Sequence, residues 1–222
     1  MTMSPLNRPA PDRRAALRAG WAALLAGAAA PGWAAPAALP DPSADVCHTP
    51  PAGATAASGS DGPVRSSTAV QLPAVRLRRH DGATVLLPAA LGEDQPVLLN
   101  FIFTSCTTIC PPMAQIFAAT QEQLGARRTQ VQMVSISIDP AHDHPARLRE
   151  YAARFDAGPQ WRFHTGSPAD IDSVQRAFNV YRPDKMGHTP VTFVRARGAR
   201  RWVRLDGFAT PQQLIREAFA AA

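Results

Sequence analysis

The chain has 222 residues, enough for one substantial domain with flanking segments. Its formal net charge is +6, but residues 1–34 contribute four arginines against one aspartate, so the remaining 19 basic and 16 acidic residues leave about +3. So small an excess gives no basis for nucleic-acid binding, and we expect no nucleic-acid partner.

Residues 1–34 have the three-part pattern of a secretory signal, with arginines first, a mildly apolar run over 20–30, and then small residues that offer a cleavage site. Adjacent Arg13 and Arg14 ahead of an Ala/Gly-rich run favour twin-arginine export over the Sec route. A retained membrane anchor over residues 19–34 is less favoured, because the apolar stretch is shorter than about 20 residues and contains Gly and Pro. We therefore expect a periplasmic protein.

Residues 35–68 are rich in Pro, Ala, Gly and Ser and have no hydrophobic periodicity, which predicts a flexible linker. Cys47 and His48 lie within it. A haem-attachment motif would need another cysteine where Ala44 stands. We interpret Cys47 as an incidental thiol, with a loose auxiliary metal ligand as the alternative.

Residues 69–222 are predicted to form the folded domain. The domain begins with a β-hairpin around an Asp81-Gly82 turn. Further strands are expected at Pro96–Phe103, Val131–Ile138, Trp161–His164, Val191–Arg195 and Arg201–Leu205, and helices at 113–124, 145–155, 168–178 and 211–222. This order predicts an α/β fold with a mixed central sheet and helices on both faces.

Capping residues predict where three helices begin. Asp143 or His144 precedes one helix, Ser167 precedes the next, and Thr210 precedes the last. Each of these helices has proline at its first position, where a missing N–H costs nothing.

Cys106 and Cys110 lie in the turn between the first buried strand and a helix that Pro111 and Pro112 begin. Unpaired N–H groups and the positive end of the helix dipole stabilise thiolates at such a position. A structural disulfide is the usual role for paired cysteines in exported proteins, but a bridge across so short a loop removes little chain entropy. The pair is better explained by soft-metal binding or by disulfide exchange. Thiolates prefer Cu(I), with imidazole as a suitable third ligand.

His188 is the favoured third ligand because it immediately precedes a buried strand, and loops at one end of such a sheet gather into one site. His142 and His144 lie near Asp139 and Asp143, where helix capping in a solvated loop explains them better than a metal cluster. The remaining histidines of the domain are His80, in the hairpin turn, and His164, at the end of a short strand.

Three motifs follow one another within residues 70–222. They are Phe103-Thr104-x-Cys106-x-x-x-Cys110-Pro111, then Ser137-Ile138-Asp139-Pro140-x-x-Asp143-x-Pro145, and finally His188. Together they resemble the Sco/SenC family of copper-handling proteins. The resemblance implies a thioredoxin-like fold, here with an N-terminal β-hairpin extension, and one copper ion held by Cys106, Cys110 and His188.

The resemblance also implies a chaperone for the copper centre of cytochrome c oxidase or a similar cuproprotein. Its partners would be a copper-accepting oxidase subunit and a periplasmic thiol reductant, and we expect a monomer. The family commonly has an Asp directly before the metal histidine, preceded by a longer loop, whereas this chain has Gly187 and a short loop. Support for the imidazole, and hence copper affinity, is expected to differ.

The alternative function is that of a thiol-disulfide oxidoreductase or thiol peroxidase, with Cys106 and Cys110 as a redox-active disulfide. Thr189-Pro190 before a strand resembles thioredoxins, in which a cis-proline faces the dithiol, and a cis bond before Pro190 is feasible. The three residues between the cysteines leave room for an ion between the sulfurs. This spacing favours the copper carrier.

Overall fold

The computed structural model describes residues 62–92 and 94–221. The strands are β1 (Val64–Thr68), β2 (Arg76–Arg79), β3 (Thr84–Leu86), β4 (Val97–Ile102), β5 (Gln132–Ser137), β6 (Trp161–Thr165), β7 (Val191–Arg195) and β8 (Trp202–Asp206). The helices are α1 (Leu87–Ala90), α2 (Cys110–Leu124), α3 (Pro145–Arg154), α4 (Pro168–Ala177) and α5 (Pro211–Ala218), with short 3-10 turns η1 (Gly125–Gln130) and η2 (Lys185–Gly187). None of the helices in the described ranges is long and apolar enough to cross a membrane. The predicted signal segment and Cys47 lie outside these ranges.

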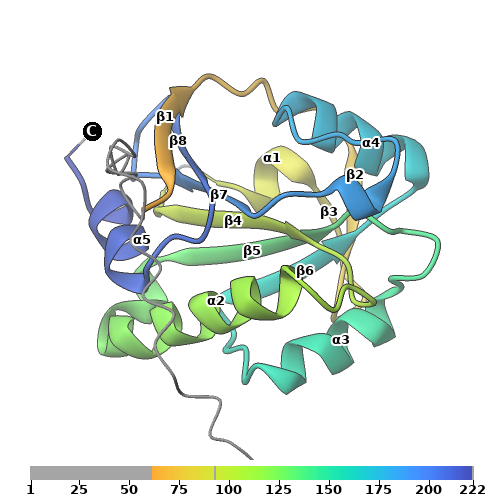
Figure 1. Ribbon diagram of the computed structural model, residues 1–222, viewed down its shortest axis with the longest axis horizontal. Helices are drawn as coiled ribbons and strands as arrows, with labels where there is room; N and C mark the ends of the chain where they lie inside the picture. The colour runs from red at the N-terminus through yellow and green to blue at the C-terminus, as the bar shows by residue number, and fades with distance from the viewer. Residues whose placement is uncertain (1–61, 93, 222) are drawn as a thin grey trace, which may run out of the picture. The chain divides into compact units, whose positions relative to one another are not determined.

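All eight strands form one sheet in the order β1-β8-β7-β4-β5-β6-β2-β3 (Figure 1). The central strands β4, β5 and β6 are parallel, and the other neighbours pair antiparallel. Every residue of β4 is buried, which explains its uninterrupted apolar run, because a parallel strand in mid-sheet is covered on both faces. The predicted mixed sheet is confirmed.

Helices cover both faces of this sheet, also as predicted (Figure 1). On one face, Phe117 of α2, Leu148 of α3 and Leu214 of α5 belong to a single hydrophobic cluster. On the other face, Leu87 of α1 and Ile171 of α4 belong to a second cluster. Burial of these two apolar layers is the main force that holds the helices to the sheet.

The N-terminal hairpin extends the sheet beyond β6, since β2 pairs antiparallel with both β3 and β6. Its turn uses the predicted Asp81-Gly82 pair. Gly82 has a φ of 97°, a conformation that favours glycine, and Asp81 Oδ1 accepts a hydrogen bond from the Ala83 backbone at 3.0 Å. The hairpin prediction is confirmed.

The three predicted caps are present. Ser167 accepts a hydrogen bond from the Asp170 backbone at 3.1 Å, and Thr210 forms a reciprocal capping box with Gln213. Of the two residues proposed to cap α3, His144 is the cap, whereas Asp143 is fully buried. Asp143 therefore has a different role.

The linker boundary predicted at residue 68 is wrong, because Val64–Thr68 form β1 and pair antiparallel with β8. Most side chains of β1 are exposed, so the segment lacks the apolar alternation that marks a half-buried strand in sequence. Backbone pairing holds it, together with an ion pair from Arg65 to Glu217 of α5 at 2.6 Å.

The topology brings three connections to one edge of the sheet. Parallel strands β4 and β5 end side by side, with Ile102 opposite Ser137. Strand β7 runs antiparallel to β4, with Thr192 opposite Asn100, and therefore begins at the edge where β4 ends. The segments after β4, after β5 and before β7 contain the cysteines, the aspartate motif and His188 respectively.

Candidate metal centre

The cysteine turn places one sulfur at the start of a helix. Cys110 is the first residue of α2, and its backbone N–H donates to Cys106 Sγ at 3.4 Å. The Thr108 hydroxyl lies 3.8 Å from the same sulfur, and Tyr151 of α3 donates its hydroxyl to the Cys110 carbonyl at 3.3 Å. Cys106 and Cys110 are both buried, and neither forms a disulfide within the described residues. The predicted position at a helix N-terminus is confirmed for this pair.

The two thiols differ in acidity. Burial raises the pKa of Cys106, but hydrogen bonds from the backbone N–H groups of Cys110 and Thr108 outweigh it, so the net pKa lies below its ordinary value. Burial raises the pKa of the Cys110 thiol well above its ordinary value, and the neighbouring Cys106 adds to the shift. Cys106 is therefore the sulfur that ionises first.

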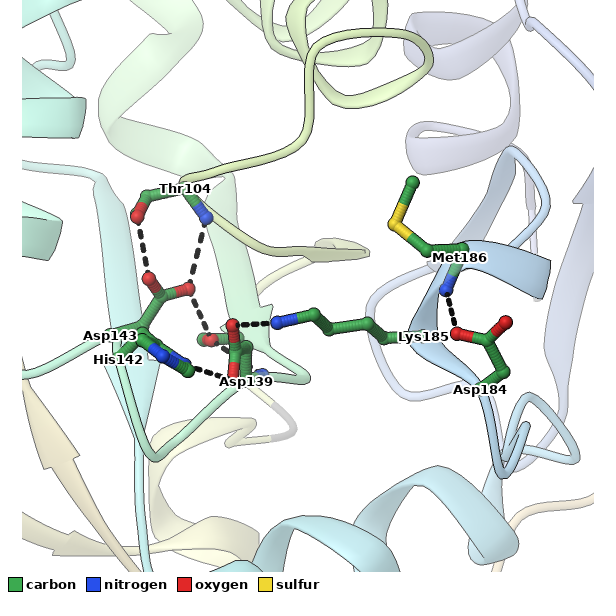
Figure 2. Close-up of polar contacts among 8 residues, drawn as sticks. Thr104, Asp139, His142, Asp143, Asp184, Lys185 and Met186 are labelled. Carbon is green, nitrogen blue, oxygen red and sulfur yellow. Dashed lines mark hydrogen bonds and ion pairs between the residues drawn. The ribbon is translucent and has the colours of Figure 1, made fainter.

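Asp143 joins the cysteine turn to the sheet (Figure 2). Its carboxylate accepts hydrogen bonds from the Thr104 backbone at 3.0 Å, from the Thr104 hydroxyl at 2.5 Å and from the Ser137 hydroxyl at 2.6 Å. Thr104 lies two residues before Cys106. The sequence did not predict that Asp143 binds Thr104 and Ser137. The available signal was that Thr104 and Asp143 both belong to the family motifs quoted above.

Asp139, two residues after the end of β5, contacts the side chains of Lys185 and His142 (Figure 2). Its Oδ2 lies 2.6 Å from Lys185 Nζ of η2, and its Oδ1 lies 3.0 Å from Nδ1 of the exposed His142. Burial raises the pKa of Asp139, but the hydrogen bonds from Lys185 and His142 outweigh it and lower the pKa overall. His142 therefore supports Asp139 in the solvated loop.

His188 lies in the neighbouring connection, half-buried against Phe103, with the two ring centroids 6.3 Å apart in an edge-to-face arrangement. Among the residues that the structure describes, its buried Nε2 has no hydrogen-bond partner. Burial lowers the pKa of His188, while the nearby Phe101 carbonyl acts in the opposite direction. The lowered pKa favours the neutral form of the ring, which is the form that binds metals.

The structure brings the two sulfurs together and places His188 beside the same turn, but it does not assemble a three-ligand cluster. Within residues 62–92 and 94–221, no three His, Cys, Asp or Glu side chains are close enough to hold a metal ion. The donor set still suits a soft ion, since it combines two thiols with an unpartnered imidazole nitrogen. A three-ligand site therefore requires the imidazole of His188 to turn from the Phe103 ring toward the sulfurs.

The cis bond suggested before Pro190 is not present, because the described part of the chain contains no cis peptide bonds. The Pro190 carbonyl accepts a hydrogen bond from the Gly207 backbone N–H at 2.9 Å. A Thr-Pro pair in a sequence does not determine the isomer of its peptide bond.

The two other histidines of the domain are structural. His80 Nδ1 accepts a hydrogen bond from the Phe163 backbone at 3.1 Å, which joins the hairpin to β6. His164 is buried in β6, and burial lowers its pKa to about 3. His164 therefore stays neutral as part of the core.

Residues 74–219 match the SCO1/SenC family. The chain is 39% identical over 97 residues to the SCO1 protein homolog of Bacillus subtilis, a match that covers 43% of this chain and 49% of that protein. The chain thus spans about half the length of this curated relative.

Two solved structures share the fold. ScoI of Bradyrhizobium japonicum with copper bound has a TM-score of 0.54 and 27% identity, covering 64% of this chain and 96% of that one. BsSco, described as a member of the Sco family of cytochrome c oxidase assembly proteins, has a TM-score of 0.57 and 23% identity, covering 71% and 99%. The fold is thioredoxin-like, as the sequence predicted.

The different environments of the two sulfurs predict unequal alkylation rates. In reduced protein carrying Cys47→Ser, iodoacetamide should modify Cys106 at least about tenfold faster than Cys110, because Cys106 receives N–H hydrogen bonds and Cys110 is fully buried. Peptide mass spectrometry over a time course measures both rates. Equal rates, or faster modification of Cys110, would contradict the assignment.

The role of Asp143 predicts a large loss of stability for Asp143→Ala. This change leaves the buried Thr104 and Ser137 donors without their acceptor, so the free energy of unfolding should fall by about 3 kcal/mol. The matched control is Glu150→Ala, which removes an exposed carboxylate from α3 and should change the free energy of unfolding by less than about 0.5 kcal/mol. Urea unfolding compares them, and equal stability of the two variants would refute the role.

Proposed function

This chain belongs to the SCO1/SenC family, and we propose that it is a periplasmic copper chaperone that binds one copper ion through Cys106, Cys110 and His188. The observation that carries the proposal is the dithiol at the start of α2 beside an imidazole whose Nε2 has no hydrogen-bond partner within residues 62–92 and 94–221. ScoI of Bradyrhizobium japonicum, 27% identical to this chain, has been solved with copper bound. The copper ion is the cargo of such a protein.

The chemistry of the site supports both loading and release. Two thiolates and a neutral imidazole form a soft donor set that favours Cu(I). Loading requires both thiols to lose their protons, so copper binding releases protons. If an oxidant removes two electrons and the sulfurs form a disulfide, the thiolate charge disappears and the copper is released.

This redox chemistry implies two partners. A periplasmic thiol reductant would return the disulfide to the dithiol before each loading. A copper acceptor would receive the ion, and we propose a cytochrome c oxidase subunit or a similar cuproprotein, because BsSco is described within a family of cytochrome c oxidase assembly proteins. The signal pattern of residues 1–34 supports the periplasm as the compartment in which they meet.

A second candidate function, thiol-disulfide exchange or thiol peroxidase activity, is favoured by one observation. The pKa of Cys106 is lowered and that of the buried Cys110 is raised, an asymmetry that suits an attacking thiolate beside a second, protected thiol. Copper carriage remains the first proposal, because disulfide exchange gives no role to His188.

Copper titration of single-site variants tests the ligand set. Reduced protein should bind one Cu(I) per chain. Cys106→Ser or Cys110→Ser should abolish tight binding because a soft thiolate is lost, and His188→Ala should weaken it by about 100-fold and change the Cu(II) absorption. A chromophoric Cu(I) competitor measures the affinities.

Cys47→Ser serves as the control in this titration and should leave both affinity and stoichiometry unchanged. An unchanged affinity and spectrum in His188→Ala would remove this residue from the proposed ligand set.

An insulin-reduction assay separates the carrier from the oxidoreductase. Metal-free protein with a dithiol donor should turn over weakly, because a carrier depends on a separate reductant. Strong turnover that is indifferent both to copper and to His188→Ala would reject the carrier and support the oxidoreductase.

A further inference from the structure

The connection that carries His188 has no carboxylate directly before the histidine. Gly187 occupies that position, and a side chain there would meet open space. Two residues earlier lies Lys185, the only lysine in the chain. Its contacts indicate where support for the imidazole comes from.

Lys185 connects η2 to a chain of buried polar contacts. Its ammonium lies 2.6 Å from Asp139, whose backbone N–H donates to the Ser137 hydroxyl at 3.0 Å. That hydroxyl donates to Asp143, which also accepts the two hydrogen bonds from Thr104. Figure 2 shows Lys185 reaching across to Asp139, with Asp143 and Thr104 beside it. The His188 connection is thus joined through Asp139, Ser137 and Asp143 to Thr104, in the turn that carries the cysteines.

Lys185 and His188 also contact the same aromatic ring. The Lys185 ammonium lies 5.5 Å from the centroid of the Phe103 ring, and the His188 ring meets that ring edge to face. Phe103 directly precedes Thr104 in the chain. Both ends of η2 are therefore docked on the segment that leads into the cysteine turn.

The turn between the two residues is closed by local hydrogen bonds. Asp184 accepts from Met186 N through its side chain at 2.9 Å and from Gly187 N through its backbone carbonyl at 3.0 Å. The His188 backbone N–H donates to the Lys185 carbonyl at 3.2 Å. A displacement of Lys185 is consequently transmitted to His188.

We propose that Lys185, anchored on Asp139, positions His188 for copper and replaces the support that a carboxylate directly before the histidine would give. This inference rests on the proposed function and adds a positioning residue to it. Lys185 itself does not bind the ion, because an ammonium has no lone pair to donate.

Replacing Lys185 can also lower stability, because its side chain is 38% exposed but that of its partner Asp139 is only 8% exposed. His142, 3.0 Å from Asp139, remains in the variants, and urea unfolding establishes that each variant is folded before it is compared. Lys185→Met keeps the length and most of the apolar stem but removes the charge. Lys185→Arg keeps the charge, and Arg200→Met removes an exposed cation from the β7–β8 connection as a matched control.

The first test uses the metal-free protein and is independent of copper. NMR cross-relaxation between the His188 and Phe103 rings should be strong in the parent chain, in Lys185→Arg and in Arg200→Met, and should be lost in Lys185→Met. Persistence of this contact in Lys185→Met would overturn the proposal, whether or not the protein binds copper.

The second test is a Cu(I) competition titration of the same variants in two backgrounds. With His188 present, Lys185→Met should lower the affinity about tenfold, the effect typical of a residue that orients a metal ligand. In the His188→Ala background the same substitution should have no further effect. An equal loss in both backgrounds would show that Lys185 acts without His188 and would refute the positioning role.

The two tests separate the two hypotheses. Failure of the parent chain to bind Cu(I) would reject the proposed function alone, since the ring contact still decides whether Lys185 positions His188. Tight binding by the parent chain, together with an unchanged affinity in Lys185→Met, would retain the copper carrier and reject the positioning role.

Discussion

The buried carboxylate of Asp143 is the interaction on which the site depends. A charge removed from water is tolerated only when hydrogen bonds satisfy it, and here the three donors come from Thr104 and Ser137. These residues belong to the turn after β4 and to the end of β5, while Asp143 itself precedes α3. One side chain therefore fixes the cysteine turn relative to the ends of the parallel strands β4 and β5.

A site held in this way gives its two sulfurs unequal environments. Cys106 lies where the first N–H of α2 can stabilise a negative charge, whereas Cys110 is enclosed by the core and has its pKa raised by burial. An ion that binds both sulfurs must therefore drive the deprotonation of the less acidic thiol. In the proposed copper site this cost would favour a cation with a strong preference for thiolate over harder ions, so burial of Cys110 would contribute to selectivity.

The sequence predicted what depends on local pattern. Apolar runs located β4 and β5, the Asp81-Gly82 turn located the hairpin, and cap residues located α4 and α5, because each rests on neighbouring residues. Contacts between distant segments were missed. The β1–β8 pairing involves exposed side chains with no apolar signature, and the contacts of Asp143 with Thr104 and of Asp139 with Lys185 join residues about 40 positions apart. The site residues were identified from their resemblance to a family's motifs. Such a resemblance indicates which distant residues share a site, but it does not give the contacts that bring them together.

The position of His188 links the fold to the proposed copper chemistry. Its buried Nε2 has no hydrogen-bond partner in the described part of the chain, which costs about 1–3 kcal/mol, and its ring packs on Phe103. A metal ion on the two sulfurs would offer this nitrogen the partner that it lacks, so the free energy of binding includes relief of an existing penalty. The anchored turn limits how far the imidazole can move, and the imidazole is the one donor of the three that lies outside the cysteine turn. Retreat of His188 to the Phe103 ring would therefore weaken the copper site without disturbing the dithiol, and this reversible third ligand suits a protein that must both hold copper and give it up.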